Sequence, residues 1–417
     1  MRMNDFEHEL DLRLAAIREQ GLSRELRRVD SPQSPQIQAG GQTLLNFSSN
    51  DYLGLANHPA VKEASIKAVE NFGAGSGAAR LVCGSLAPHH ELEEALAAFK
   101  GTEAALTFSS GYATALGTIC ALLGKDDVIV IDKLVNACIV DAARLCGAKL
   151  RVFRHNDLND LEQILRWSST FRLSGRTLKR ELQPPHTLIV TESVFSMDGD
   201  LAPLRNLVEL KEKYAAWLMV DEAHATGLFG EKRRGLAEEF AVADQIEIQM
   251  GTLGKALGAA GGFICGSRAL IELLINRART FIFSTAPVPA ASAAARAAVQ
   301  LVQSDEGQRR RHSLWARVDQ LKNGLVKLGW SLPAVRSAII PLIIGDETKA
   351  VELSAALRER GIFIPAIRYP TVARGQARLR LTASAEHTDD GIGQLISALR
   401  SIANRQSPIA NTDASPG

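Results

Sequence analysis

The sequence lacks the cysteine pattern of a disulfide-bonded or zinc-binding protein. Its five cysteines are odd in number and scattered, whereas disulfide frameworks and structural zinc sites need regularly spaced pairs. They are Cys83, Cys120, Cys138, Cys146 and Cys265. We therefore expect small core cysteines in a protein of a reducing compartment, and we expect no metal site.

The sequence also has little excess charge and no long apolar run. Its 48 basic and 46 acidic residues give a formal net charge of +2, and the basic cluster at residues 309–311 is short. Nucleic acid is therefore not an expected partner. The amino terminus is polar and acidic, unlike a signal peptide, and no apolar run has the length of a membrane span. We expect a soluble, cytoplasmic protein with no membrane partner.

The sequence does contain enough apolar residues to form a large core. The 417 residues are 46% hydrophobic, which suits one large domain and a smaller one. We expect an N-terminal helix and arm over residues 1–45, a large domain over 46–290, a small domain with linking helices over 291–405, and a disordered tail over 406–417.

Buried β runs alternate with helical segments through the middle of the chain. This alternation predicts a mostly parallel sheet covered by helices on both faces. Strands are expected at residues 44–47, 104–108, 128–131, 150–153, 187–191, 216–220, 246–250, 262–265, 339–344, 362–366 and 378–382. Helices are expected at 4–30, 59–72, 90–100, 113–123, 158–167, 203–214, 268–279, 290–303, 308–328, 348–360 and 389–404. A linker is expected at 31–41 and an exposed loop at 172–185.

An acidic residue follows the apolar run at residues 216–220. The segment 219–224 has the sequence Met-Val-Asp-Glu-Ala-His. Asp221 would lie just past the carboxyl end of a strand, where open α/β sheets bind ligands. The alternative is that Asp221 caps a helix.

A lysine among small residues follows the next expected strand. Lys255 lies in segment 250–258, in which several glycines and an alanine leave room for a flat group beside the amine. A lysine in a partly dry pocket can form a Schiff base, although a solvated loop lysine is the alternative. An acid that can pair with a ring nitrogen and a lysine that can bind an aldehyde are the two groups that pyridoxal phosphate (PLP) needs.

Two nucleotide-binding motifs are incomplete. Asp-Glu-Ala-His is the signature of one helicase class, and Gly-Lys occurs in the phosphate loop of nucleotide hydrolases. That loop needs four residues between its glycines and a Ser or Thr after its lysine. Only two residues separate Gly251 from Gly254, and Ala256 follows Lys255. The helicase alternative is therefore the less favoured one.

A strand–turn–helix unit offers an anion site. The turn at residues 109–112 would aim the backbone N–H groups and the positive end of the next helix at one point. We expect a phosphate cradle at Gly111 and Tyr112, with an ordinary βα connection as the alternative. Segment 73–80 is rich in glycine but lacks the spacing of a dinucleotide fingerprint, so an active-site loop is the better interpretation.

Five segments together resemble the α-oxoamine synthases, a family of fold-type-I PLP enzymes, over about residues 10–402. They are residues 46–55, 191–200, 221–224, 251–255 and 283–285. The resemblance implies an α/β fold. A large domain would hold a mostly parallel seven-stranded sheet between helices, with a smaller α+β C-terminal domain and an N-terminal helical arm.

The resemblance also implies roles in binding the cofactor. Lys255 would bind the PLP aldehyde and then move protons, and Asp221 would pair with the ring nitrogen. His224 and Ser196 would contact the phenolic edge of the ring. The expected phosphate contacts, the last two reaching a neighbouring subunit of a homodimer, are Gly111, Tyr112, Thr252, Ser284 and Thr285.

One position departs from the family pattern. The family places a histidine over the cofactor ring, where this sequence has Asn136. An amide can lie flat over the ring but cannot titrate near neutral pH, and it gives up an aromatic stack that contributes about 1 kcal/mol. Slower turnover, altered substrate choice or a different product would each be consistent with the change.

Substrate contacts are implied by the same resemblance. Arg380 would bind the amino acid's carboxylate through its guanidinium group, with Arg368 as the second candidate and Asn50 assisting. Thr371 and an arginine of the first helical region would hold an acyl substrate. The two candidates for that arginine are Arg24, which we prefer, and Arg27.

Within the family, the sequences of segments 46–52 and 221–224 are most similar to those of a member that joins L-alanine to a pimeloyl thioester. The thioester would be carried on coenzyme A or on an acyl carrier protein, and the products would be 8-amino-7-oxononanoate, carbon dioxide and a free thiol. A glycine-dependent 2-amino-3-ketobutyrate ligase or aminolevulinate-type synthase is an alternative. A non-catalytic subunit of a synthase pair is another, although such subunits usually lack the lysine found here at position 255.

Overall fold

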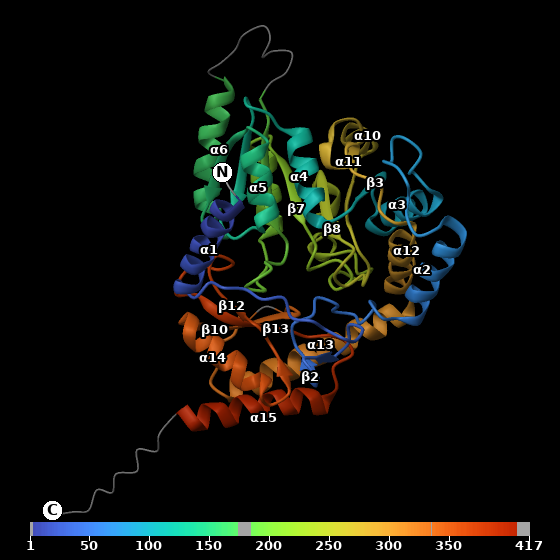
Figure 1. Ribbon diagram of the computed structural model, residues 1–417. Coiled ribbons are helices and arrows are strands. Elements are labelled where there is room, and N and C mark those ends of the chain that lie inside the picture. The colour runs from blue at the N-terminus through green and yellow to red at the C-terminus, as the bar shows by residue number, and fades with distance from the viewer. Residues whose placement is uncertain (1–2, 174–184, 335, 407–417) are drawn as a thin grey trace, which may run out of the picture. The chain divides into compact units, whose positions relative to one another are not determined.

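The computed structural model describes residues 3–173, 185–334 and 336–406 (Figure 1). The chain forms two compact units. The larger unit comprises Ser49–Pro341 and Thr382–Ile396, and the smaller one comprises the described parts of Met1–Ser48, Leu342–Leu381 and Ser397–Gly417. The expected disordered tail and most of the expected loop at 172–185 lie outside the described residues, and the expected domain boundaries stay a prediction. No helix in the described ranges combines the length and apolar character of a membrane span.

A seven-stranded sheet forms the centre of the larger unit. In spatial order its strands are β3 (Ala104–Phe108), β9 (Gly262–Gly266), β8 (Ile248–Thr252), β7 (Trp217–Asp221), β6 (Thr187–Glu192), β4 (Val128–Asp132) and β5 (Lys149–Phe153). Only β9 runs against its neighbours, and every residue of β4, β6 and β9 is buried. The predicted seven-stranded, mostly parallel sheet is confirmed. Because the other strands share one direction, their carboxyl ends meet at one edge.

The larger unit also contains helices, several of which cover the sheet. They are α2 (Pro59–Phe72), α3 (Ala87–Lys100), α4 (Gly111–Leu122), α5 (Ala137–Leu145), α6 (Leu158–Leu173), α8 (Leu204–Lys213), α9 (Leu236–Glu239), α10 (Arg268–Arg277), α11 (Arg279–Ile282), α12 (Pro289–Gln303) and α13 (Asp305–Lys327), with a 3-10 turn at Ala243–Gln245. In Figure 1, α4 and α5 pack together on the viewer's side of the sheet, and α2 and α3 pack on α12 beside β3. The sequence did not predict α5, whose first turn is capped by the Asn136 side chain accepting from Cys138 N at 3.1 Å.

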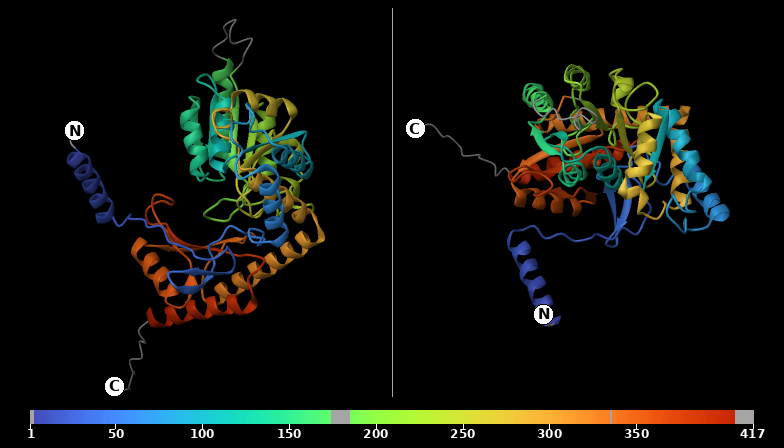
Figure 2. Two further views of the ribbon diagram at one scale, coloured as in Figure 1. Left: turned by 45° about the vertical axis from the view of Figure 1, so that its right-hand side comes forward. Right: turned by 90° about the horizontal axis from the view of Figure 1, so that it is seen from above.

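The smaller unit contains two short sheets. One has the order β1 (Gln36–Ala39), β2 (Gln42–Asn46) and β11 (Ile362–Phe363), and the other has the order β10 (Ile339–Gly345), β13 (Ala377–Thr382) and β12 (Ala366–Ile367). Its helices are α1 (Met3–Glu19), α14 (Glu347–Arg358) and part of α15 (Asp389–Gln406). Both views of Figure 2 show α1 standing clear of β1 and β2.

Three expectations for the smaller unit were wrong. The first helix ends at Glu19 instead of near residue 30. The expected linker at 31–41 contains β1, which pairs with β2 across a two-glycine turn in which Gly40 and Gly41 both have positive φ, the conformation that a tight hairpin requires. The expected strand at 362–366 divides into β11 and β12, because Pro365 between them has no N–H to continue a ladder.

Candidate active site

Two buried carboxylates lie side by side at the carboxyl ends of β6 and β7. Glu192 is the register partner of Asp221, and both side chains are buried. Burial raises the pKa of Asp221, while the positive charge of Lys255 and a hydrogen bond from Ala223 N oppose that shift. Burial, and then the charge of Asp221, raises the pKa of Glu192 to about 8. The two carboxyl groups therefore leave this edge of the sheet in need of positive charge.

A chain of hydrogen bonds leads from the predicted lysine to two residues of an earlier segment. The amine Nζ of Lys255 lies 2.7 Å from Nε2 of His224, and Nδ1 of His224 lies 2.7 Å from the hydroxyl of Tyr52. That hydroxyl lies 3.1 Å from Oδ1 of Asn50. His224 and Tyr52 are buried, and Lys255 is half-buried. The structure thus brings the predicted residues Lys255, His224 and Asn50 together through Tyr52, which the sequence analysis did not single out.

The predicted phosphate residues also lie together. Ser110 caps α4 by accepting from Ala113 N at 3.1 Å, and the first turn of a helix presents N–H groups that have no partner within the helix. A Cβ atom on Gly111 would lie 3.9 Å from Oγ1 of Thr252, so the two are neighbours. Tyr112 follows, exposed, and its hydroxyl donates to Asp141 Oδ2 on α5 at 2.8 Å.

Glu192 gathers two further predicted residues. Ser196 N donates to Oε2 of Glu192 at 3.2 Å, and the backbone N–H of Asn136 donates to the same carboxylate. The loops that follow β4 and β6 are thereby tied to one buried side chain. Asn136 is exposed, and its side chain is used in capping α5.

A charged clamp, formed by His155 with Asp132 and Asp200, lies at the same edge of the sheet. It connects the carboxyl end of β4 to the loop after β6. His155 Nδ1 lies 2.9 Å from Asp132 Oδ1, and Nε2 lies 2.7 Å from Asp200 Oδ2. Burial opposes the charge on this imidazole, but the hydrogen bonds to the two carboxylates outweigh it and raise the pKa of His155 to about 10. The clamp therefore carries a positive charge at neutral pH and fixes both loops.

The carboxylate next to Asp221 in the chain has a different environment. Glu222 forms a fully buried ion pair with Lys100, at the end of α3, and accepts from Ala237 N at 2.8 Å. The Lys100 amine also donates to the carbonyl of Arg234 at 2.6 Å. Glu222 thus joins the turn after β7 to α3.

Ser284 and Thr285 lie in another part of the larger unit. Thr285 is exposed and forms a bridge with Ala79, and Ser284 is half-buried. The carbonyl of the nearby Pro287 lies 2.7 Å from Nε2 of His89 on α3. Their predicted contact with a neighbouring subunit stays a prediction.

The remaining predicted residues belong to the smaller unit. Arg380 is buried in β13. Arg368 donates to the carbonyls of Gly21 and Ser23, at 2.6 and 3.3 Å, and its own carbonyl accepts from Thr371 N. Arg368 therefore holds the segment leading to Arg24 near Thr371. The second candidate of the first helical region, Arg27, has its guanidinium 5.8 Å from the ring centre of Phe363.

The residues present fit the predicted cofactor. Oε1 of Glu192 is buried without a hydrogen-bond partner among the described residues, and its neighbour Asp221 has a raised pKa. A protonated ring nitrogen would supply the positive charge that this pair lacks. Lys255 offers an amine, and the start of α4 offers an anion site. In the described ranges, no group of three or more His, Cys, Asp or Glu residues could hold a metal ion.

Residues 42–399 match the family model of the class I and II aminotransferases. The chain belongs to this aminotransferase family. The match covers both units, and it leaves the helicase alternative without support.

The relatives that this chain matches include proteins named 8-amino-7-oxononanoate synthase. The one from Geobacter sulfurreducens is 47% identical over 389 residues, which are 93% of this chain and 96% of the relative. The one from Geotalea daltonii is 45% identical over 403 residues, or 97% and 98% of the two chains.

Solved structures agree with the predicted fold type. Sphingomonas wittichii serine palmitoyltransferase is 31% identical, with a TM-score of 0.86 over 97% of this chain and 98% of that one. The 8-amino-7-oxononanoate synthase of Francisella tularensis is 27% identical, with a TM-score of 0.72 over 87% of this chain and 98% of that one. The predicted fold-type-I architecture is confirmed.

The sequence analysis missed some residues of the site although the sequence contained a signal for them. Glu192 and Asp132 both end a buried parallel strand, as Asp221 does, so the same rule would have found them. Tyr52 and His155 left no comparable signal, because their partners are distant in the sequence.

Proposed function

We propose that the chain catalyses the PLP-dependent condensation of L-alanine with a pimeloyl thioester to give 8-amino-7-oxononanoate, carbon dioxide and a free thiol, a step of biotin synthesis. The observation that carries the proposal is the placing of Lys255, His224 and the Asp221–Glu192 pair at one edge of the sheet. Relatives that match nearly the whole chain and bear the name of this activity support the choice of reaction.

The side chains of the larger unit account for the first half of the reaction. When bound, PLP supplies an electron sink for the carbanion formed at the α-carbon of the amino acid. Asp221 would keep the ring nitrogen positively charged, and that charge would also favour the ionised form of Glu192, whose pKa is raised by burial and by Asp221. Lys255 Nζ anchors the cofactor, then takes the α-proton from the amino acid and returns a proton to the product.

Phosphate binding and ring orientation fall to residues around the same edge. The start of α4 at Gly111 and Tyr112 would hold the phosphate, and the Thr252 hydroxyl, which donates to the Gly261 carbonyl at 3.0 Å in this structure, would turn to join it. His224 and Ser196 contact the phenolic edge of the ring. Asn136 would take the place of the family's histidine beside the ring, and since an amide does not titrate near neutral pH, no titrating group would act from that position.

Substrate recognition falls to arginines of the smaller unit. Arg380 binds the carboxylate of L-alanine in two-point fashion, assisted by Asn50, and Arg368 is the second candidate. Thr371 and Arg24 hold the acyl thioester. The contact of Arg368 with the segment before Arg24 supports a shared acyl-binding surface made by these residues.

A homodimer with shared active sites completes the proposal. Val82 and Phe283 are 77% and 71% exposed, and they lie on two loops joined by the Ala79–Thr285 bridge. Large apolar side chains exposed on paired loops suit a second copy of the chain. Ser284 and Thr285 on one of these loops would then reach the neighbour's phosphate. Helix α1 adds an uncovered apolar face formed by Phe6, Leu10, Leu14 and Ile17.

The test is a substrate comparison on the purified protein loaded with PLP. Absorbance is recorded with L-alanine and with glycine, and product is measured by mass spectrometry after adding pimeloyl-CoA or pimeloyl-acyl carrier protein. We expect 8-amino-7-oxononanoate from L-alanine. Faster use of glycine would replace the proposal by the glycine-dependent alternative, and a protein that binds no PLP would end it.

The matched variants are Lys255→Ala and Lys232→Ala, the second at an exposed lysine. We expect Lys255→Ala to lower kcat by about 10⁴-fold or more, equivalent to about 5.5 kcal/mol of barrier, because the amine both anchors the cofactor and moves the proton. Lys232→Ala should keep wild-type turnover. An unchanged lysine-bound cofactor spectrum in Lys255→Ala would refute the lysine assignment.

A further inference from the structure

Tyr52 occupies a position that neither the sequence motifs nor the reaction accounts for. Its side chain is fully buried, and its hydroxyl lies between Nδ1 of His224, at 2.7 Å, and Oδ1 of Asn50, at 3.1 Å. The other ring nitrogen of His224 faces the amine of Lys255 at 2.7 Å. Tyr52 is therefore separated from the reactive amine by a single imidazole ring.

The groups at the two ends of this chain of hydrogen bonds restrict the directions that its bonds can take. A protonated Lys255 amine can only donate, and the amide oxygen of Asn50 can only accept. With a protonated amine and a neutral ring, His224 Nε2 accepts and Nδ1 carries the proton that is donated to Tyr52. The Tyr52 hydroxyl in turn donates to Asn50 Oδ1. In that protonation state Tyr52 holds the imidazole in the Nδ1–H tautomer.

Cofactor binding would reverse this direction, an argument that rests on the proposed function. The phenolic oxygen of PLP is negatively charged and accepts hydrogen bonds, so His224 would have to donate to it from Nε2. Nδ1 would then become the acceptor. A hydroxyl can serve both states because it donates as well as accepts. A phenylalanine at position 52 could serve neither.

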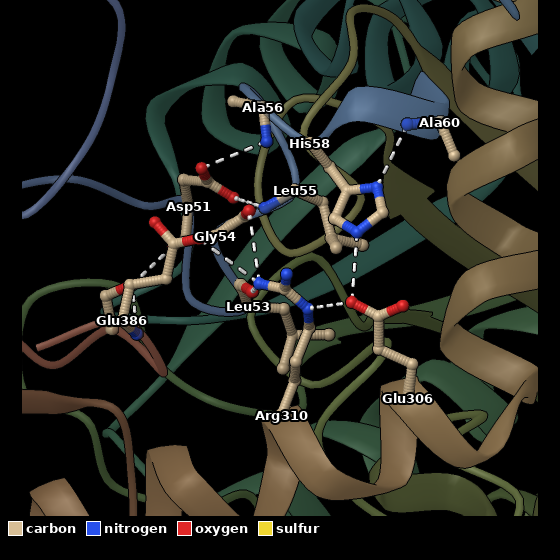
Figure 3. A network of polar contacts seen from close by, with 11 residues as sticks. Asp51, Leu53, Gly54, Leu55, Ala56, His58, Ala60, Glu306, Arg310 and Glu386 are labelled. Carbon is tan, nitrogen blue, oxygen red and sulfur yellow. Dashed lines mark hydrogen bonds and ion pairs between the residues drawn. The ribbon is translucent and has the colours of Figure 1, made fainter. Parts of the chain in front are cut away.

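The segment that carries Tyr52 is held firmly in place (Figure 3). Asp51 accepts from Leu55 N at 2.8 Å and from Ala56 N at 3.0 Å. Arg310 of α13 donates to the carbonyl of Leu53 at 2.9 Å and contacts Glu386 at 3.3 Å. The tyrosine hydroxyl is therefore a fixed partner for the imidazole.

The lysine loop packs directly on this segment. Gly258, three residues after Lys255, has φ +60, and a Cβ atom there would lie 2.3 Å from Ala56 N. Only glycine fits at such an approach. The two loops therefore have a fixed spacing, which keeps His224 in reach of both Tyr52 and Lys255.

We propose that Tyr52 is a positioning residue that acts through His224: its hydroxyl orients the imidazole and supports either tautomer, so that Nε2 can face the lysine amine or donate to the phenolic oxygen of the bound cofactor. Through His224, Tyr52 would control the hydrogen bonding and the charge at the phenolic edge of the cofactor.

The test uses the PLP-loaded enzyme and the substitution Tyr52→Phe, with Tyr214→Phe as the matched control. The control removes a hydroxyl that donates to Glu162 at 2.9 Å, away from the lysine loop. We expect Tyr52→Phe to raise the dissociation constant of PLP about tenfold, equivalent to about 1.4 kcal/mol. We also expect the pH midpoint of the lysine-bound cofactor's absorbance to rise, because a phenolic oxygen that loses a hydrogen-bond donor holds the neighbouring proton more tightly. Tyr214→Phe should change neither value.

A double-substitution cycle separates action through His224 from a general loss of packing. In a His224→Gln background, adding Tyr52→Phe should leave the absorbance midpoint unchanged, because the residue through which Tyr52 acts is gone. Equal shifts from Tyr52→Phe in both backgrounds would overturn the proposal, as would a Tyr52→Phe enzyme with wild-type midpoint and PLP affinity.

One measurement needs no Tyr52 variant and holds even if Tyr52→Phe fails to fold. Selective ¹⁵N labelling of histidine, with the His224 signal assigned by His224→Gln, reports which ring nitrogen carries the proton in the PLP-loaded wild type. We expect the proton on Nε2, and a proton on Nδ1 would overturn the proposal. A wild type that binds no PLP would instead refute the proposed function on which the inference rests.

Discussion

Asp221 and Glu222 are neighbours in the sequence and both are buried, yet their surroundings differ in kind. Glu222 faces the Lys100 amine and accepts from Ala237 N. Asp221 lies beside a second carboxylate, Glu192, and burial raises its pKa. Glu222 thus has a cationic partner within the described residues, whereas burial raises the pKa of both Asp221 and Glu192, and the charge of Asp221 adds to the shift at Glu192.

The difference separates a carboxylate that holds the fold from one that is available to a ligand. Breaking a well-paired buried ion pair is costly, but such a pair has no capacity to bind a ligand. A buried carboxyl group with a perturbed pKa is, by contrast, typical of a functional site. Substituting each member should therefore affect a different property: activity on the Asp221 side and stability on the Glu222 side.

Among the variants that test this contrast, Asp221→Asn has the largest expected effect, and the effect is on activity. An amide cannot keep a ring nitrogen positively charged, so we expect kcat/KM to fall about 10³-fold, equivalent to about 4 kcal/mol of transition-state stabilisation. Steady-state kinetics with L-alanine measures the effect, and the melting temperature should stay close to wild type. Asp319→Asn, at an exposed ion pair, is the control. A large loss of stability with unchanged kcat/KM would erase the contrast.

The second effect is on stability, from Lys100→Met. Removing one member of a fully buried ion pair leaves the other uncompensated, and we expect about 3 kcal/mol of lost unfolding free energy. Lys67→Met is the control, since its ion pair with Glu63 is fully exposed to solvent and should contribute little to stability. Urea unfolding measures both. Equal losses in the two variants would contradict the structural role of Glu222.

The smallest effect concerns a third arrangement, in which two carboxylates share one imidazole. Since folding raises the pKa of His155 from 6.5 to about 10, its stabilising contribution is fully present below pH 6.5 and is lost as the pH rises toward 10. We expect His155→Gln to cost about 1 kcal/mol at low pH, because the half-buried group is partly screened, and the difference from wild type to shrink at higher pH.

Urea unfolding at several pH values, with the exposed His312→Gln as control, measures this trend. A difference between wild type and His155→Gln that grows with pH would show that the imidazole is neutral in the folded protein.

The chemistry-bearing residues were largely predictable because parallel strands deliver their carboxyl ends to one edge. Asp221, His224 and Lys255 follow two such strands within a short stretch, and local patterns place them. Tyr52 was not predictable in this way. It reaches His224 across 172 positions in the sequence, and a single tertiary hydrogen bond leaves no periodic trace.

The errors in the smaller unit have a similar physical origin. The segment before residue 30 has helical composition, but the helix ends at Glu19, and Gly21 just beyond it takes a positive φ, the conformation with which glycine commonly closes a helix. Strand β1 is only four residues long, and its pairing depends on a turn that was interpreted as a linker. In the larger unit, by contrast, long buried runs made the pattern clear.

Helix α3 joins two places that matter for different reasons. Near its start His89 contacts the carbonyl of Pro287, beside the segment expected to meet a second copy of the chain, and at its end Lys100 holds Glu222 next to Asp221. Fourteen helical residues span about 21 Å as one stiff body. Self-association and cofactor affinity should therefore be thermodynamically linked, so that dilution loosens the cofactor and saturation with cofactor tightens the association by the same factor.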